Sequence, residues 1–228
     1  MKEQISIKIK DIELSGIINY GLHVKAWIIF AHGSGSSRLS VRNNWIANQL
    51  VERGFGTLLF DLLTPKEDTF YSNRFNISLL ASRLIAATSW LTLSPHYHAQ
   101  KIGYFGASTG AAAAIMAAAE ADPDLPLYAI VSRGGRPDLA GLGFLNELRL
   151  PTLLIVGGHD EKVIELNQWA ETKIPYATVT IVPGAGHLFE EAGALEEVKE
   201  LSANWFDIHL QKVGIDDSTE RLNSTRTE

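Results

Sequence analysis

Short apolar runs alternate with amphipathic stretches along most of the chain. Residues 5–10 alternate strictly between apolar and polar side chains, which predicts a half-exposed strand, and residues 12–18 are expected to return beside it as a hairpin. Later runs are continuously apolar, as is typical of parallel strands buried on both faces. These runs are Ala26–Ala31, Gly56–Phe60, Lys101–Phe105, Leu127–Val131, Thr152–Val156 and Ala177–Val182.

Between these runs, apolar side chains recur at the spacing of a helix. The clearest examples are Trp45, Ile46, Leu50 and Val51, then Leu79, Leu80, Leu84 and Ile85, and later Val163–Trp169 and Leu195–Leu210. Strands that alternate with helices predict βαβ units. We therefore expect an α/β fold: a mostly parallel, doubly wound sheet with an antiparallel N-terminal hairpin and helices on both faces.

The predicted domain is single and spans residues 1–212. Residues 213–228 are expected to form a flexible tail, because the chain from Gly214 onwards is rich in Asp, Ser, Thr and Glu. The polar segment Leu62–Asn76, broken by Pro65, is expected on the surface near the carboxyl edge of the sheet. No inserted helical block is long enough to form a substantial lid.

Composition restricts the classes of function. The net charge of −6 argues against a nucleic-acid-binding surface, and the absence of cysteine excludes disulfides, cysteine-ligated zinc and a cysteine nucleophile. The N-terminus lacks the apolar stretch of a secretory signal, and no run approaches the ~18 apolar residues of a membrane span. We expect a soluble, cytoplasmic protein without a membrane partner. An exposed edge strand within residues 5–18 leaves monomer and homodimer open.

Gly106-Ala107-Ser108-Thr109-Gly110 matches the pattern G-x-S-x-G, and its position gives the match weight. An apolar strand precedes it and an alanine-rich helical stretch follows. A serine on such a sharp strand-to-helix turn presents its hydroxyl above the sheet. The backbone N–H groups at the start of the next helix are suited to a developing negative charge. Ser108 is therefore a candidate nucleophile, although five such letters arise easily in a chain with 19 glycines.

A serine nucleophile needs a base, and a carboxylate that orients the base. Asp160 comes just after the buried strand 152–156, and His187 lies in the loop after strand 177–182. Both should stand at the same sheet edge as Ser108, in the chain order Ser, Asp, His of α/β-hydrolases. Each residue alone has an ordinary explanation, since an Asp after a strand is usually a turn or capping residue. The weaker alternatives are His23, His96, His98, His159 and His209 for the base and Asp138 and Glu161 for the acid.

Two further loops follow buried strands. In the first loop, His32-Gly33-Ser34-Gly35, the glycines let backbone N–H groups approach a ligand closely, so the N–H groups of Ser34 and Thr109 are candidate oxyanion donors. The alternative is a bare tight turn with phosphate affinity. Arg133 and Arg136 lie in the glycine-containing loop after strand 127–131. Their guanidinium groups would suit a substrate carboxylate or phosphate, or would pair with an acid such as Asp138.

Together, the motifs at residues 32–35, 106–110, 158–160 and 184–187 resemble those of the α/β-hydrolase family, in its dienelactone-hydrolase-like branch, over residues 5–210. The resemblance implies a cofactor-free and metal-free carboxylester hydrolase working through an acyl-enzyme. In it Ser108 attacks, His187 relays the proton and Asp160 orients His187. True dienelactone hydrolases carry cysteine at the nucleophile position, whereas this chain has Ser108.

The expected activity is therefore hydrolysis of small esters or lactones, with acidic substrates favoured if the arginine loop binds an anion. A thioesterase or short-peptide hydrolase would use the same residues. A nucleotide-binding protein is a different class of alternative, but the chain lacks G-x-G-x-x-G and G-x-x-x-x-G-K-[ST] spacing. A hydrolase fold retained as a non-catalytic interaction module is a third.

Overall fold

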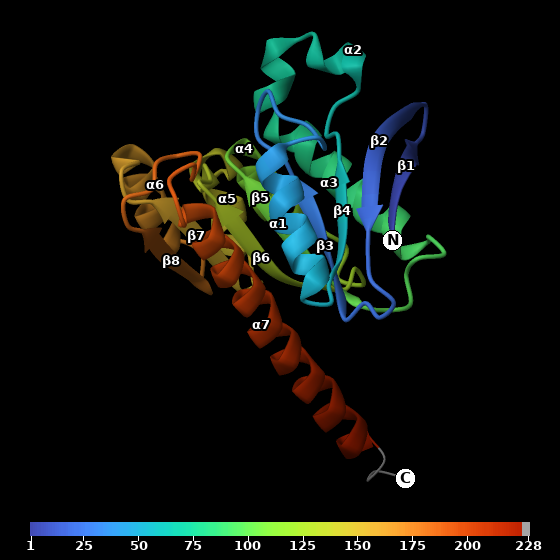
Figure 1. Cartoon of the computed structure of the whole chain (residues 1–228). Coiled ribbons are helices and arrows are strands. Elements are labelled where there is room, and N and C mark those ends of the chain that lie inside the picture. Colours follow the sequence, from blue (N-terminus) through green and yellow to red (C-terminus); the bar gives the residue numbers. More distant parts are fainter. Residues whose placement is uncertain (225–228) are drawn as a thin grey trace.

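A computed structural model describes the backbone of residues 1–224 and the side chains of residues 1–213. Its sheet has eight strands in the order β1-β2-β4-β3-β5-β6-β7-β8 (Figure 1). β2 pairs antiparallel with both β1 and β4, and the remaining neighbours are parallel. The strands are β1 (Lys2–Ile9), β2 (Ile12–Asn19), β3 (Ala26–Ala31), β4 (Gly56–Phe60), β5 (Lys101–Ala107), β6 (Leu127–Arg133), β7 (Thr152–Gly157) and β8 (Ala177–Val182).

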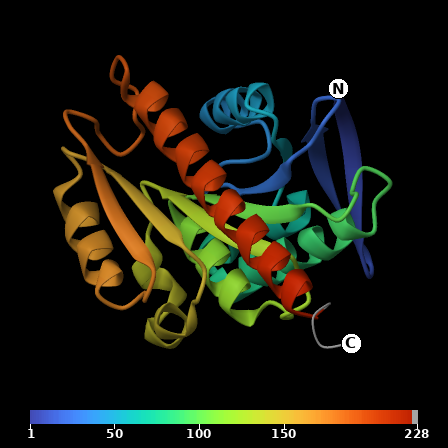
Figure 2. The ribbon, with the colours of Figure 1, turned by 90° about the horizontal axis from the view of Figure 1, so that it is seen from below.

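Helices cover both faces of this sheet. Along the chain they are α1 (Val41–Glu52), α2 (Pro65–Asp68), the 3-10 turn η1 (Tyr71–Phe75), α3 (Ile77–Thr92), α4 (Thr109–Glu120), the 3-10 turn η2 (Pro137–Ala140), α5 (Leu142–Glu147), α6 (Glu161–Glu171) and α7 (Ala194–Ser224). α1 and α7 pack on one face, and α3, α4, α5 and α6 on the other. Figure 2 shows α7 crossing its face of the sheet beside α1.

Successive residues of β3 explain why its sequence is continuously apolar. Trp27 and Ile29 contribute to the core under α3 and α4, whereas Ile28 and Phe30 contribute to the core under α1 and α7. Side chains alternate across a strand, so a strand covered on both faces needs apolar residues at every position. The predicted doubly wound sheet with an antiparallel hairpin is confirmed.

Residues 62–76 include two short helical elements, α2, which Thr64 and Glu67 start with a reciprocal capping box, and η1. One segment differs from the expectation. α7 continues to Ser224 and extends past the sheet (Figure 1), although the apolar pattern places its end near Leu210. The residues after Leu210 include poor helix formers such as Gly214 and Asp216, so neither the hydrophobic pattern nor helix propensity indicates this extension. Residues 225–228, and the side chains of the predicted tail, lie outside the described residues.

The carboxyl ends of the parallel strands define the functional edge. The loops after β3, β5, β6, β7 and β8 all leave the sheet there, because these strands share one direction. Open α/β sheets bind ligands outside this edge. The fold therefore gathers residues 32–40, 108, 133–136, 158–160 and 183–189 from distant parts of the sequence.

Candidate active site

Ser108 occupies a sharp turn between β5 and α4, with φ 51° and ψ −120°. A positive φ is costly for a residue with a side chain, and such strain is concentrated at functional sites. The flanking glycines are sterically required. A Cβ on Gly106 would lie 2.5 Å from the Cα of Ala111, and one on Gly110 would lie 2.1 Å from the carbonyl oxygen of Ala31. The glycines of G-x-S-x-G thus allow α4 to pack close to β3 and β5.

Backbone hydrogen bonds tie Ser108 to the loop after β6. The Ser108 N–H donates to the carbonyl of Arg133 at 3.3 Å, and the Ser108 carbonyl accepts the N–H of Arg136 at 3.1 Å. Both bonds involve main-chain groups of the strained residue. They hold the Ser108 backbone in place and set the neighbouring Arg133 at the same edge.

Asp160 and His187 lie in contact at the functional edge. His187 Nδ1 lies 2.6 Å from Asp160 Oδ2. Asp160 occupies the N-cap position of α6, but its side chain makes no capping bond and accepts from His187 instead. Since a carboxylate only accepts, Nδ1 carries the proton and Nε2 is left as a proton acceptor. The two loops pack closely here: a Cβ on Gly157 would lie 2.4 Å from the carbonyl oxygen of Gly186.

Ser108 and His187 line one cavity of about 250 Å³, together with Ser34, Arg42 and Arg133. The loop after β3 approaches the serine directly, because a Cβ on Gly33 would lie 3.1 Å from Ser108 Cβ. Among the described residues, no hydrogen bond uses the backbone N–H of Ser34 or Thr109. These two N–H groups are therefore available as hydrogen-bond donors.

Five of the seven alternative bases and acids lie elsewhere or are occupied, whereas His159 and Glu161 flank Asp160. His23, His96 and His98 belong to the loops that precede β3 and β5, at the opposite sheet edge, and the ring of His209 lies tilted against that of Trp205 on α7. Asp138 accepts two hydrogen bonds from Arg136, at 2.8 and 2.7 Å.

The two arginines of the β6 loop differ sharply. Arg136 is paired with Asp138, which raises its pKa through that hydrogen bond. Arg133 is only 7% exposed, and its Nε and Nη1 have no partner among the described residues. Its Nη2 lies 3.4 Å from the Asn43 side-chain oxygen. Burial, with a smaller contribution from Arg42, lowers the pKa of Arg133 to about 10.

Sequence reasoning missed Arg42 as a cavity residue. The periodicity of residues 41–52 indicates which face of α1 is buried, but not that its first turn overhangs the edge of the sheet. Arg42 makes an ion pair with Glu190 at 2.5 Å, in the loop that follows His187. The chain therefore brings a second cation to the cavity that contains Ser108 and Arg133.

Comparisons with known proteins support this architecture. No family model matches the chain. A dienelactone hydrolase from Anabaena variabilis is 45% identical, with a TM-score of 0.86, over 92% of this chain and 98% of that one. The chain belongs to the dienelactone-hydrolase-like α/β-hydrolases. A dienelactone-hydrolase-like promiscuous phosphotriesterase from metagenomic libraries shares the fold at 17% identity and a TM-score of 0.74, over 92% of this chain and 98% of that one.

This dienelactone-hydrolase-like protein also matches part of a longer relative. A Mycobacterium tuberculosis protein, provisionally named a phosphoribosyl transferase, is 51% identical over 209 residues, which are 91% of this chain and 46% of that protein. The chain thus spans about half the length of the curated relatives it matches. The fold and the neighbours support an enzyme of the hydrolase type. Within residues 1–224, no helix is long and apolar enough to cross a membrane.

Proposed function

We propose that the protein is a serine hydrolase that cleaves small carboxylic esters or lactones through an acyl-enzyme. The observation that carries the proposal is the strained Ser108 turn in one cavity with His187, whose Nδ1 is held by Asp160 at 2.6 Å. A hydroxyl at a sharp turn, a base with a free Nε2 and an orienting carboxylate are the parts that acyl transfer needs.

In the proposed acylation, Ser108 Oγ attacks the ester carbonyl carbon while His187 Nε2 takes the hydroxyl proton. The carbonyl electron pair moves onto oxygen, and the Ser34 and Thr109 N–H groups donate hydrogen bonds to this oxyanion. Collapse re-forms the carbonyl and breaks the bond to the alkoxide, which takes the proton from His187. In a lactone the released alcohol stays attached to the acyl group.

Deacylation repeats these steps with water. His187 Nε2 takes a proton from water, the hydroxide attacks the acyl carbon, and the Ser108 oxygen leaves with the proton that His187 returns. Asp160 stabilises the imidazolium in both halves without becoming protonated itself. The net reaction consumes one water and releases an acid and an alcohol from an ester, or one hydroxy acid from a lactone.

Arg133 and Arg42 support a preference for acidic substrates. A buried cation without a carboxylate partner is costly, and protein interiors normally pair such groups. Arg133 has unpartnered donors, and its guanidinium lies in the wall of the cavity that contains Ser108. A substrate carboxylate or phosphate would supply the missing acceptor. Arg136 does not share this role in the proposal, because its Nε and Nη2 already donate to the Asp138 carboxylate.

Covalent labelling tests the proposed nucleophile. A tagged fluorophosphonate should label the wild type and fail to label Ser108→Ala, whereas Ser36→Ala should label normally although Ser36 lines the same cavity. His187→Ala should react far more slowly, since the hydroxyl loses its base. Equal labelling of Ser108→Ala and wild type would place the nucleophile elsewhere.

Thioesters and short peptides would use the same residues. A substrate panel with matched acyl groups separates the three: oxygen esters, thioesters and aminoacyl amides. The proposal expects the highest kcat/KM for the oxygen esters.

A further inference from the structure

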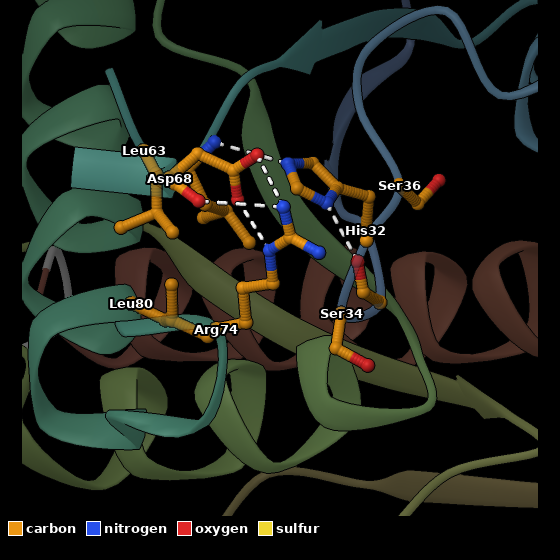
Figure 3. Close-up of a pocket in the computed structure, with 10 residues that line it drawn as sticks. His32, Ser34, Ser36, Leu63, Asp68, Arg74 and Leu80 are labelled. Carbon is orange, nitrogen blue, oxygen red and sulfur yellow. Dashed lines mark hydrogen bonds and ion pairs between the residues drawn. The ribbon is translucent and has the colours of Figure 1, made fainter. Parts of the chain in front are cut away.

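His32 links two loops at the functional edge. Its ring is partly buried between the loop that carries Ser34 and the segment after β4 that carries Leu63, Asp68 and Arg74 (Figure 3). Nδ1 lies 2.9 Å from the carbonyl oxygen of Gly33, and Nε2 lies 3.1 Å from the backbone nitrogen of Leu62. The proposed chemistry assigns this ring no role.

These two contacts determine the ring's tautomer. The Gly33 carbonyl can only accept, so Nδ1 must carry a proton, and the Leu62 N–H can only donate, so Nε2 must be bare. A protonated imidazolium would place two donors face to face at Leu62. Burial lowers the pKa of His32 despite the opposing effects of the Gly33 hydrogen bond, Asp61 and Asp68, and so favours the neutral ring.

The bond to Gly33 also sets the direction of the next N–H. The described chain has no cis peptide bond, and in a planar trans peptide the carbonyl of one residue points opposite to the N–H of the next. Holding the Gly33 carbonyl toward the His32 ring therefore turns the Ser34 N–H to the other side. Gly33 itself abuts Ser108, and Ser34 lines the cavity that contains Ser108.

We propose that His32 is a positioning residue: through its Nδ1–H bond to the Gly33 carbonyl, it holds the Ser34 N–H in the direction needed to stabilise the oxyanion. The inference rests on the proposed function, in which Ser34 is an oxyanion donor. Leu62 anchors the far side of the ring, and Leu62 follows β4. The sheet thus fixes the orientation of the Ser34 N–H through Leu62 and the His32 ring.

The surrounding charges are already paired and leave the ring's bonds undisturbed. Asp61 binds the Arg38 backbone N–H at 2.8 Å and forms an ion pair with its guanidinium. Arg74 donates to Asp68 at 2.8 and 2.9 Å. The cavity beside the ring is about 10 Å³, so there is room for no more than about one water.

The Ser36 N–H also donates to the Gly33 carbonyl, at 3.1 Å, so removing His32 should loosen the donor without abolishing it. Deleting an oxyanion donor outright costs about 10²–10³ in kcat. We therefore expect about a 10- to 100-fold loss of kcat when the Nδ1 bond alone is lost, with KM nearly unchanged, because the oxyanion exists only in the transition state.

Two amide variants separate positioning from packing. In His32→Asn, the amide nitrogen replaces Nδ1 and can still donate to Gly33. In His32→Gln, the amide oxygen replaces Nε2 and can accept from Leu62, but the bond to Gly33 is lost. The proposal predicts that kcat of the Asn variant stays within about 3-fold of wild type, while kcat of the Gln variant falls about 10- to 100-fold. A packing role predicts the opposite order, since Gln fills the ring volume better.

Inhibition by a trifluoromethyl ketone gives a second readout, because its adduct with Ser108 carries an oxyanion. Its inhibition constant should rise in the Gln variant by the same factor as kcat/KM falls, and should change little in the Asn variant. A weaker adduct in both variants alike would overturn the positioning role.

The ring itself can be observed in the unmodified protein, which covers the case in which a variant fails to fold. Long-range ¹H–¹⁵N correlations should show His32 with a protonated Nδ1 and a bare Nε2, and the reverse tautomer would overturn the proposal. If the wild type neither turns over esters nor reacts with a fluorophosphonate, the proposed function fails and this inference fails with it. An active wild type whose Asn variant is no better than its Gln variant overturns this inference alone.

Discussion

Replacing Arg133 with methionine should have opposite effects on stability and on the use of acidic substrates. Methionine keeps an unbranched chain of similar length but removes the charge. The folded protein holds this cation with a pKa lowered from 12.5 to about 10. A shift of that size corresponds to about 3 kcal/mol of unfavourable free energy at neutral pH. The lost contacts to Asn43 and to the Phe189 ring offset part of that gain.

We therefore expect Arg133→Met to raise the free energy of unfolding by about 1–2 kcal/mol, which for a domain of this size raises Tm by about 2–8 °C. The measurement is a urea or thermal unfolding curve at pH 7. The matched control is Arg136→Met, which breaks the surface pair with Asp138 and should change stability by less than about 1 kcal/mol.

The same variant should lose its preference for acidic esters. A hydrogen bond to a charged group contributes about 1.5–3 kcal/mol, which corresponds to about a 10- to 150-fold change in kcat/KM. The assay compares a p-nitrophenyl hemiglutarate with p-nitrophenyl valerate, two esters with the same leaving group and acyl chains of similar length. The acidic ester should lose activity by that factor and the neutral ester by little. The reasoning would be refuted if Arg133→Met lost equal kcat/KM on both esters. It would also be refuted if Arg136→Met lost as much kcat/KM on the acidic ester as Arg133→Met does.

Three further predictions follow from the geometry. Asp160→Asn should lower kcat by about 10³–10⁴ with a modest change in KM, because an amide favours the wrong tautomer of the base; steady-state kinetics would contradict this if kcat fell less than tenfold. Gly110→Ala should destabilise the fold by at least about 3 kcal/mol in urea titrations, because the added Cβ would lie 2.1 Å from the Ala31 carbonyl oxygen. The control is Gly143→Ala, whose Cβ would have no neighbour within 4 Å and which should be neutral or stabilising. Folding lowers the pKa of His32 from its ordinary value of 6.5. Below pH 6.5 the unfolded chain therefore binds more protons than the folded protein. The free energy of unfolding should then fall as the pH drops below 6.5. Urea titrations at about pH 7.5 and 5.5 should show a smaller drop in His32→Asn, and an equal drop would contradict the assignment.

The sheet was predictable because both-face burial leaves a strong local signal. In β3, every position is apolar since Trp27 and Ile28 face different helical layers. Ser108, Asp160 and His187 could be proposed together because each follows a strand of the same direction, and parallel strands end at one edge. Local sequence thus determines which residues reach the edge.

The differences between neighbouring residues at that edge could not be predicted in the same way. Arg133 and Arg136 look equivalent in the sequence, but Asp138 binds one of them, and the other is buried beside residues some ninety positions earlier in the chain. The role of His32 depends on a bond to Leu62, which is set by the pairing of β3 with β4. Such properties arise from long-range packing, for which the hydrophobic pattern carries no signal.

The central claim is that Ser108 forms an acyl-enzyme with an ester substrate. Rapid acid quenching after mixing the protein with a p-nitrophenyl ester, followed by intact-mass and peptide mass spectrometry, tests it directly. The account predicts a mass increase equal to the acyl group, located on the peptide at Ser108 and absent from Ser108→Ala. Ester turnover without any acyl adduct on Ser108, or with the adduct on another residue, would contradict it.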